Sequence, residues 1–597
     1  MKGSDFIAKF IQDMGSDHAF VLTGGACAHM IDSMGQLPGF KLVCVQHEQA
    51  GAMAAECYSR FHKGMGVTVV TSGPGATNLI TGIACAWFDS LPVFHLAGQV
   101  NTFEQKGDLK IRQMGFQETD IVPMVKGITK YAERVTKAED LRAVLEEAVY
   151  WALEGRQGPV LVDIPFNIQT AEVDPDKLRR FVPPAKPKAP QFPNEMKDIL
   201  ARLKTAKRPV LLVGGGVKLA HGRKELLDLA KTLNIPIVTT WSGLDVVSAD
   251  DPLYRGQIGV YGARAANFTV QNSDLLISVG SRIDSRITGG KYKSFAREAF
   301  RVIVDIDAAE IDKGRVDASL PLCMDAKDFC VQLTKAAQSV VSPVASCASW
   351  VAESAQWLKD FPIYDRSEIS REWVNPYLYF DVLSKMAPKD ALLISDCGGN
   401  LSWTVQGFAP RGEQRIVSAM GNSPMGYSFP AAIGAHFAAP GKPLYCIIGD
   451  GGLQINLQEF QTIVHYKIPM KLMILNNHGY GIIKQFQDLY LGSRYIATGE
   501  GYSCPDYSKL SSAYGIPYVC INNDHEVEAK LASALAMPGP VVIDVQMKED
   551  QRIEPKLGWG KPIEDQLPLL PRDVFEKHMH IQPLVEEVKK QATNEIN

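Results

Sequence analysis

The sequence lacks most of the features that would set it apart from ordinary globular proteins. Its 11 cysteines stand singly along 597 residues with no Cys-X-X-Cys pair, a pattern that disfavours structural zinc and indicates a reducing compartment. No apolar run approaches the roughly 20 residues that a membrane-spanning helix needs. The start, Met1 to Gly15, has apolar residues at helical spacing and lacks the apolar core of a secretion signal. We therefore expect a cytoplasmic protein without a membrane segment.

An excess of charge of either sign is also absent. The chain has 62 Lys and Arg against 66 Asp and Glu, a net charge of −4, so it carries no electrostatic footprint for nucleic acid or an anionic membrane. Apolar residues make up 46% and charged residues 21%, as in a soluble globular enzyme. A chain of this length exceeds one hydrophobic core and predicts about three to five domains.

One pattern occurs three times along the chain. A strand, a glycine-rich turn, a helix and a proline-led second strand follow one another in residues 66–97, 210–240 and 444–475. Each unit is typical of a mostly parallel sheet with helical crossovers. The predicted fold class is therefore α/β, with three doubly wound parallel-sheet domains.

The boundaries between these domains are expected where the composition changes. Val182 to Pro193 is rich in proline and lysine, as in a stiff linker, and the polar end of the chain is expected to be disordered. The expected division is residues 1–180 for an N-terminal domain, 181–193 for the linker, 194–340 for a central domain, 341–375 for a connecting segment, 376–555 for a C-terminal domain and 556–597 for a tail.

Two segments of the third unit predict a metal and phosphate site. The turn Gly449-Asp450-Gly451-Gly452 follows an apolar strand pattern, and the next apolar run ends at Asn476-Asn477. Both would lie at the carboxyl edge of a parallel sheet, where such sheets bind ligands. A carboxylate, an amide oxygen and a main-chain carbonyl suit Mg²⁺, and a glycine-rich turn at a helix N-terminus favours phosphate. Gly-Asp-Gly alone is more often a plain tight turn. Together with the paired asparagines at the end of the next strand, it favours the metal and phosphate site.

Glu48 is a candidate for acid–base chemistry. It stands where a strand pattern over Val43 to Val45 gives way to a helix pattern rich in small residues. An acidic residue at that junction can also do no more than complement the helix N-terminus. The residues alone leave both interpretations open.

The central region has the glycine turn Gly214-Gly215-Gly216 after a strand pattern. It lacks the full Gly-X-Gly-X-X-Gly spacing and the downstream acidic residue of a dinucleotide fingerprint, so the turn alone is weak support for a nucleotide. An empty nucleotide-type fold is the competing interpretation.

A series of motifs in a fixed order resembles the acetolactate synthases, a family that uses thiamine diphosphate (ThDP). The motifs are TGGA, HEQAGAMAAECYSR, TSGPGATN, AGQV, GFQETDIV, GPVLVDIP, TTWSGL, GSRIDSR, MGYSFPAAIGA and GDG followed by NN, from about Asp5 to about Asp550. In wording the chain is most similar to the acetolactate synthase-like flavoenzymes of nucleotide-sugar and O-antigen pathways. The resemblance implies an N-terminal domain for the ThDP pyrimidine, a central FAD domain and a C-terminal domain for diphosphate and Mg²⁺.

The resemblance also implies roles for single residues. Glu48 would bond N1′ of the pyrimidine, and Gly25 and Gln117 would face substrate carbonyls. Mg²⁺ would be held by Asp450, Asn477 and the main-chain carbonyl of Gly479. The other residues implied to line ThDP, with Met425 as the apolar wedge beneath it, are Cys397, Gly398, Gly399, Asn400, Ser423, Met425, Gly451, Gly452, Tyr480, Gly481 and Ile483.

Two further sets follow from the resemblance. Phe116 and Phe486 would contact substrate. The residues implied to bind FAD are Gly214, Gly215, Gly216, Arg282, Asp284, Arg286, Asp305, Asp307 and Asp325.

Three positions depart from the synthases that make branched-chain amino acids. Those enzymes carry Lys where this chain has Phe166, Trp where it has Phe486, and Gln-His where it has Gly399-Asn400. The machinery of the reaction is kept while positions that select the second substrate differ. The amino-acid pathway role is therefore in doubt.

The expected function is ThDP- and Mg²⁺-dependent decarboxylation of a 2-oxo acid, with pyruvate as the preferred donor, and transfer of the two-carbon unit to a second carbonyl. The acceptor is left open among a nucleotide-linked keto-sugar, an aldehyde and another pyruvate. A simple decarboxylase and a catalytically silent cofactor-binding protein are the rival functions. The family arrangement implies a homodimer or homotetramer with the active site at the subunit interface.

Overall fold

The computed structural model describes residues 1–186, 189–339, 347–365 and 369–584. The chain forms two compact units, the first from residues 1–188 with 366–552 and the second from residues 189–365 with 553–597. The predicted disorder of the chain end falls outside the described residues. In the described part of the chain, no helix combines the length and the apolar character that crossing a membrane requires.

The first unit begins with a six-stranded parallel sheet in the order β2-β1-β3-β4-β6-β5. Its strands are β1 His18–Val21, β2 Lys41–Cys44, β3 Gly66–Val70, β4 Val93–Gln99, β5 Tyr131–Arg134 and β6 Val160–Pro165. Its helices are α1 Gly3–Asp13, α2 Ala28–Gly35, α3 Glu48–Phe61, α4 Pro74–Asn78, α5 Ile80–Phe88, α6 Ile121–Val125, α7 Leu141–Leu153 and α8 Phe166–Thr170.

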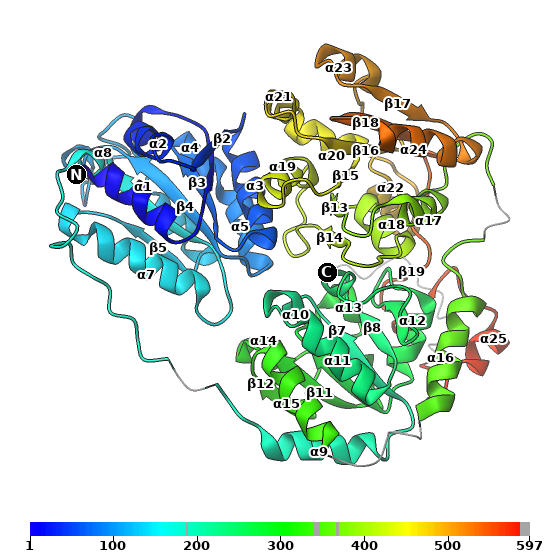
Figure 1. Cartoon of the computed structure of the whole chain (residues 1–597). Coiled ribbons are helices and arrows are strands. Elements are labelled where there is room, and N and C mark those ends of the chain that lie inside the picture. Colours follow the sequence, from blue (N-terminus) through cyan, green and yellow to red (C-terminus); the bar gives the residue numbers. More distant parts are fainter. Residues whose placement is uncertain (187–188, 340–346, 366–368, 585–597) are drawn as a thin grey trace. The chain divides into compact units, whose positions relative to one another are not determined.

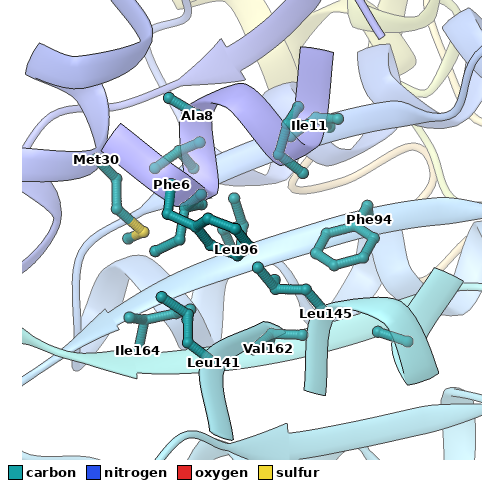
Figure 2. Close-up of a cluster of buried hydrophobic side chains, with 14 of the residues drawn as sticks. Phe6, Ala8, Ile11, Met30, Phe94, Leu96, Leu141, Leu145, Val162 and Ile164 are labelled. Atoms are coloured by element: carbon teal, nitrogen blue, oxygen red, sulfur yellow. The ribbon is translucent and has the colours of Figure 1, made fainter. Parts of the chain in front are cut away.

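Side chains that alternate along these strands divide the core into two layers. Leu96 and Val162 pack with helices α1, α2 and α7 on one face, as Figure 2 shows. Their neighbours in sequence, Ala97 and Leu161, pack with α3, α5 and α6 on the other face. Successive strand residues point to opposite faces of a sheet, so the near-continuous apolar strands of this sequence predict helices on both sides.

The first unit also contains the sheet of the C-terminal region, ordered β14-β13-β15-β16-β18-β17 and parallel throughout. Counted along the chain, this order repeats that of the first sheet. The strands are β13 Leu392–Ser395, β14 Arg415–Val417, β15 Leu444–Gly449, β16 Met470–Asn476, β17 Tyr518–Ile521 and β18 Val541–Gln546. The helices are α17 Pro376–Met386, α18 Gly399–Gly407, α19 Ser428–Ala438, α20 Asp450–Leu453, α21 Phe460–His465, α22 Gly481–Tyr490, α23 Tyr507–Ala513 and α24 Val527–Ala536.

Helices α3 and α19 pack closely and join the two sheets of the first unit. A Cβ added at Gly434 would lie 1.9 Å from the carbonyl oxygen of Ala54. Only small residues allow two helix backbones to approach this far. The small-residue helix pattern after Glu48 thus serves packing against the C-terminal region.

The second unit holds a six-stranded parallel sheet in the order β12-β11-β10-β7-β8-β9. The direction of winding reverses between β7 and β10, which is where sheets of this order bind nucleotides. The strands are β7 Pro209–Val213, β8 Ile237–Thr239, β9 Tyr254–Gln257, β10 Leu275–Val279, β11 Phe300–Asp305 and β12 Leu320–Cys323. The helices are α9 Pro193–Leu203, α10 Gly216–Leu219, α11 Arg223–Leu233, α12 Arg264–Gln271, α13 Ser285–Thr288, α14 Ala308–Ile311, α15 Ala326–Gln338 and α16 Ala348–Asp360.

The tail of the chain packs on this second unit. It forms the short antiparallel pair β19 Lys556–Leu557 and β20 Gln566–Leu567, followed by α25 Arg572–Lys577. Figure 1 shows α25, in red, beside the green helix α16. The three sheets confirm the predicted α/β class with three parallel-sheet domains.

Two helices that the sequence pattern predicts as continuous are interrupted. The expected helix over residues 453–466 breaks at Asn456, whose backbone is non-helical because its amide donates to the carbonyl of Gly426 at 2.9 Å. The expected helix over residues 76–87 is divided at Leu79 into α4 and α5. Contacts from distant segments override the helical periodicity at the first of these positions.

Candidate functional site

Glycines bring three segments together at the carboxyl edge of the C-terminal sheet. The strand β15 passes directly into helix α20 at Asp450, without an intervening turn. A Cβ at Gly452 would lie 2.2 Å from Oδ2 of Asp396, and one at Gly451 would lie 2.4 Å from the ring of Tyr480. Side chains here would push the segments apart. The predicted residues around 396–400, 449–452 and 477–481 therefore meet at one place.

Asp450 is a buried carboxylate at the first turn of α20. Tyr502 donates to its Oδ2 at 2.5 Å, and Tyr507 donates to its main-chain oxygen at 2.5 Å. Burial raises the pKa of the Asp450 carboxyl to about 6. Within the described residues no ion pair neutralises this side chain, so its charge is available to a bound cation.

The polar atoms around Asp450 fit a hard cation and an anionic group. Asn477 is buried, and its side-chain nitrogen has no hydrogen-bond partner; the assignment of N and O in such an amide can be exchanged. The carbonyl of Gly479 accepts from the N–H of Gly481 at 3.0 Å and keeps a second lone pair. Among the described residues, no group of three or more His, Cys, Asp or Glu side chains could hold a metal ion. A metal here would use amide, main-chain and ligand oxygens, as Mg²⁺ does.

Asp396 packs against Gly452 on the side of the site formed by Gly426. Its Oδ2 accepts from the N–H of Gly426 at 3.0 Å, while its Oδ1 is buried without a partner. Burial raises the pKa of the Asp396 carboxyl to about 6. The next residues lead into Gly398, whose φ of +75° favours glycine. The start of α18 at Gly399 then presents its N–H groups at the sheet edge.

The segment that carries Ser423 and Met425 is fixed from both sides. Asp89 accepts from the main-chain N–H groups of Met420 and Gly421 at 2.9 and 2.8 Å. Met425 is half-buried, and Ser423 has a φ of +53°. A left-handed conformation at a non-glycine residue is held by its surroundings. This conformation places Met425 next to Gly426, whose N–H donates to the carboxylate of Asp396.

Glu48 lies at the carboxyl edge of the N-terminal sheet, at the first residue of α3. Its side chain is 7% exposed, and its Oε2 accepts from the amide of Asn78 at 2.9 Å. A Cβ at Gly75 would lie 3.3 Å from Oε1, so the Ser-Gly-Pro-Gly turn approaches the carboxyl closely. Among the described residues no cation pairs with this carboxyl, whose other oxygen is left available to a hydrogen-bond partner.

Gln117 and Gly25 belong to the same edge. Gln117 has a φ of +64°, and a Cβ at Gly73 would lie 3.1 Å from the Gln117 Cβ. Gly25 is exposed and has open space around it, while its neighbour Gly24 packs on Thr71. The structure thus brings Gln117 to the turn beside Glu48, and leaves Gly25 facing outward.

Residues of the C-terminal region form hydrogen bonds with the main chain just before Glu48. Oε1 of Glu459 accepts from the N–H of Gln46 at 3.0 Å, and the hydroxyl of Tyr466 accepts from the N–H of Cys44 at 2.7 Å. Both contacts fix the segment between β2 and α3. In the part of the chain that the structure describes, no hydrogen bond or ion pair joins Glu48 itself to Asp450.

Aromatic residues predicted to face substrate are exposed. Phe116 is 86% exposed, and Phe486 is 42% exposed with its ring centre 4.9 Å from that of Tyr490. Ile483 lies on the same helix, α22, and is exposed as well. Phe166 begins α8, and its ring centre lies 4.9 Å from that of His29.

In the second unit, Gly214 and Gly216 lie at the reversal point of the sheet. Their N–H groups donate to the carbonyls of Val279 and Gly280, both at 2.9 Å. A Cβ at Gly214 would lie 2.1 Å from the Gly280 oxygen, and one at Gly215 would lie 2.7 Å from Ser242. The turn is therefore compressed between two loops at the position where a dinucleotide would fit.

The acidic residues predicted beside this turn have local roles. Side chains of Asp284, Asp307 and Asp325 accept from main-chain N–H groups and cap helices α13, α14 and α15. Arg282 forms an ion pair with Asp284 at 3.4 Å. Asp305 accepts from the N–H of Asp307 at 3.0 Å. These contacts shape the loops of the carboxyl edge.

Sequence reasoning missed several residues of the site. Asn78, Glu56 and Arg60 stand inside motifs that carry the family resemblance, so their motif membership was an available signal. Tyr502 and Tyr507 reach the site from a segment without a recognisable pattern. Glu459 stands in the predicted helix over residues 453–466, where its spacing does not mark it as a site residue.

Most of the chain matches family models of thiamine pyrophosphate enzymes and individual acetolactate synthases. Residues 1–124 match the thiamine pyrophosphate enzyme N-terminal TPP binding domain, residues 196–333 the central domain, and residues 396–545 the C-terminal TPP binding domain. The chain is 34% identical over 576 residues to the acetolactate synthase isozyme 2 large subunit of Escherichia coli, covering 94% of this chain and 98% of that protein. It is 33% identical over 556 residues to the acetolactate synthase large subunit of Porphyra purpurea, covering 91% of each. The chain therefore belongs to the thiamine pyrophosphate enzyme family, as an acetolactate synthase-like enzyme.

Proposed function

We propose that this chain is a ThDP- and Mg²⁺-dependent carboligase that decarboxylates pyruvate and passes the two-carbon unit to a second carbonyl compound. The observation that carries the proposal is the buried Asp450 carboxylate, which has no ion-pair partner among the described residues. It is supported by Asn477, whose side-chain nitrogen has no hydrogen-bond partner there. ThDP, when bound, supplies the nucleophilic carbon and the electron sink that decarboxylation needs.

The residues of the chain have distinct parts in this proposal. Glu48 holds a proton at N1′ of the pyrimidine, and Asn78 orients its carboxyl. Asp450, Asn477 and the Gly479 carbonyl hold Mg²⁺. Main-chain N–H groups at the starts of α18 and α20 bind the diphosphate.

Met425 and Gln117 complete the proposed active site. Met425 is the apolar support beneath the cofactor, fixed by the hydrogen bonds of its segment. Gln117, beside Gly73, donates to the carbonyl oxygen of the substrate, and Gly25 leaves room for it. Exclusion of water from this pocket protects the reactive carbon from protonation.

For the acceptor we propose a nucleotide-linked keto-sugar. Phe166 replaces the Lys of the amino-acid synthases, so this position offers no cation to the carboxylate of a second 2-oxo acid. The exposed rings of Phe116 and Phe486 suit a large acceptor with apolar faces. A second pyruvate, which would give 2-acetolactate, is the alternative that the relatives' names support.

The proposal extends to FAD, the assembly and the domains. The strand order and the glycine turn at the reversal point of the second unit support FAD there. We include in the proposal a homodimer or homotetramer with shared active sites, as the family resemblance implies. We keep the domain boundaries of the sequence analysis as part of this proposal.

The experiment is incubation of the protein with ThDP, Mg²⁺ and pyruvate and a panel of carbonyl acceptors, with products identified by mass. The panel contains pyruvate alone, simple aldehydes and nucleotide-linked 4-keto-sugars. We expect an adduct larger than the keto-sugar by C₂H₄O, which is pyruvate less the CO₂ that leaves. Free acetaldehyde as the sole product would show a simple decarboxylase instead.

A further inference from the structure

Gly426, the residue after Met425, is held through both of its main-chain groups. Its N–H donates to Oδ2 of Asp396 at 3.0 Å, and its carbonyl accepts from the side-chain amide of Asn456 at 2.9 Å. Both of these side chains are fully buried, so water does not compete for either hydrogen bond. Two buried polar side chains therefore fix the main chain directly beside Met425.

The space around Gly426 is filled as well. A Cβ at this position would lie 2.8 Å from the Cβ of Ile455 and 3.0 Å from the carbonyl oxygen of Gly452. The φ of Gly426 is +79°, a value that residues with a side chain rarely adopt. Glycine at this position therefore allows close contact between the segment of Met425 and the segment that follows Asp450.

The two side chains belong to the two segments proposed to bind the diphosphate. Asp396 stands shortly before α18, and Asn456 stands shortly after α20. The atom of Asp396 that accepts from Gly426, Oδ2, is also the atom on which Gly452 of α20 packs. The position of Met425 is thus set relative to both of these segments at once.

These contacts are made at a local cost in regular structure and in hydrogen bonding. Asn456 has a φ of −130° and a ψ of 29°, which interrupt a helical stretch. Oδ1 of Asp396 is buried and has no hydrogen-bond partner among the described residues, although buried polar atoms are nearly always paired. Departures of this kind concentrate where a protein needs a particular geometry. They indicate that the two hydrogen bonds to Gly426 serve the site as well as the fold.

We propose that Asp396 and Asn456 are positioning residues, which hold Met425 at a fixed place relative to the diphosphate segments and so determine how the two rings of bound ThDP face each other. Each acts through Gly426 and Met425 rather than by contact with the cofactor. The inference rests on the proposed function, because the role of Met425 as the support beneath the cofactor belongs to that function.

The test measures how fast the proton at C2 of the thiazolium ring of bound ThDP exchanges for deuterium, by NMR of samples quenched after mixing with D₂O. The rate depends on how closely the amino group of the pyrimidine approaches that carbon, so it reports the arrangement of the two rings. Each protein is saturated with ThDP and Mg²⁺, so that differences in affinity do not contribute.

The variants are Asp396→Ala and Asn456→Ala, with Ser384→Ala as the matched control. The Ser384 hydroxyl is also a buried acceptor for a main-chain N–H, that of Ala409 at 2.9 Å, in the same C-terminal region. We expect exchange to slow by about 10²-fold in Asp396→Ala and Asn456→Ala, the effect of a misplacement of roughly 1 Å. Exchange in Ser384→Ala should equal that in wild type.

Met425→Ala separates positioning from a general loss of structure. Because Asp396 and Asn456 act through Met425, their substitution should slow exchange in the wild-type background and have no further effect in Met425→Ala. Equal slowing in both backgrounds would overturn the inference, as would normal exchange in Met425→Ala itself. Melting temperatures show which variants are folded, and the two positions are tested separately, so that either one decides the question if the other variant unfolds.

The wild-type rate tells a failure of this inference from a failure of the proposed function. Wild-type protein that binds ThDP without exchanging its C2 proton faster than free ThDP would refute the proposed function, and this inference with it. Fast exchange in wild type, together with the same fast exchange in Asp396→Ala and Asn456→Ala, would refute this inference alone.

Discussion

The hydroxyl of Tyr427 donates a hydrogen bond of 2.5 Å to Oε2 of Glu56. Glu56 is fully buried in helix α3, which begins at Glu48, and Tyr427 stands just before α19, close to Met425. Arg60 pairs with Glu56 and, at 2.7 Å, with Asp89. Burial raises the pKa of both Glu56 and Tyr427. This network fixes the segment proposed to support the cofactor to the helix that carries the proposed acid.

Replacing Tyr427 by Phe should destabilise the protein by about 1–3 kcal/mol, because a buried charged acceptor loses its donor. Binding of ThDP should weaken as the Met425 segment loosens. Thermal unfolding with and without ThDP measures both effects. Tyr379→Phe is the matched control, since the Tyr379 hydroxyl is buried without a partner and its removal should be neutral or stabilising. Equal melting temperatures for the two variants would contradict this account.

Glu459 makes stability depend on pH. Burial raises the pKa of its carboxyl from 4.5 to about 7. A group whose pKa is raised on folding contributes stability that is complete below the unfolded pKa of 4.5 and is lost as pH rises through about 7. Glu459→Gln keeps an acceptor for the N–H of Gln46 and removes the titration. Relative to wild type, the variant should gain up to about 3 kcal/mol between pH 4.5 and pH 8. Melting temperatures of both proteins across this range measure the gain, and a constant difference between them would exclude the role of Glu459.

We expect the flavin proposed for the second unit to make the purified protein yellow. Gly215→Ala should release it, because the added Cβ would lie 2.7 Å from Ser242 Cβ and distort the glycine turn. Gly290→Ala is the control in the same sheet region, since nothing lies within 4 Å of its added Cβ. Absorbance spectra of the purified proteins give the flavin content. An active wild-type protein without flavin would refute the FAD proposal.

Asp450 should control metal-dependent binding of ThDP. Asp450→Asn removes the charge that faces the cation, so Mg²⁺ should no longer strengthen ThDP binding, and treatment with a chelator should give wild-type protein the same low affinity. Asp390→Asn, which alters an exposed pair with Lys442, should behave as wild type. Calorimetric titration of ThDP at several Mg²⁺ concentrations measures this. A normal response to Mg²⁺ in Asp450→Asn would place the metal elsewhere.

The sequence predicts the strands of this fold well, because they depend on local signals, whereas the turn predicted at Gly449-Asp450-Gly451-Gly452 is the end of strand β15 and the start of helix α20. The apolar runs before Asp450 and before Asn477 form the paired strands β15 and β16. Local periodicity fails where a distant partner decides the backbone. Asn456 breaks a predicted helix because its amide reaches Gly426, 30 residues away.

In the candidate site, too, residues within local motifs are predictable, and residues brought in from distant segments are not. Asp450 and Asn477 are recognisable because each directly follows a strand within a motif, and Glu48 because it begins a helix within a motif. Tyr502 reaches Asp450 across 52 residues, and Glu459 reaches Gln46 across 413 residues. Packing of the tail on the central sheet places the ammonium of Lys556 5.8 Å from the ring centre of Tyr261, which stands far earlier in the chain. Contacts of this range leave no periodic signal in the sequence.

The central claim is that the carboxyl of Glu48 activates bound ThDP. The most direct measurement is the turnover of pyruvate by Glu48→Gln, saturated with ThDP and Mg²⁺, against Glu139→Gln, which alters an exposed side chain of the same domain. We expect turnover in Glu48→Gln to fall by about 10²–10⁴, the range for a positioned acid–base group, with ThDP still bound, and no change in Glu139→Gln. Turnover close to wild type in Glu48→Gln would contradict the account.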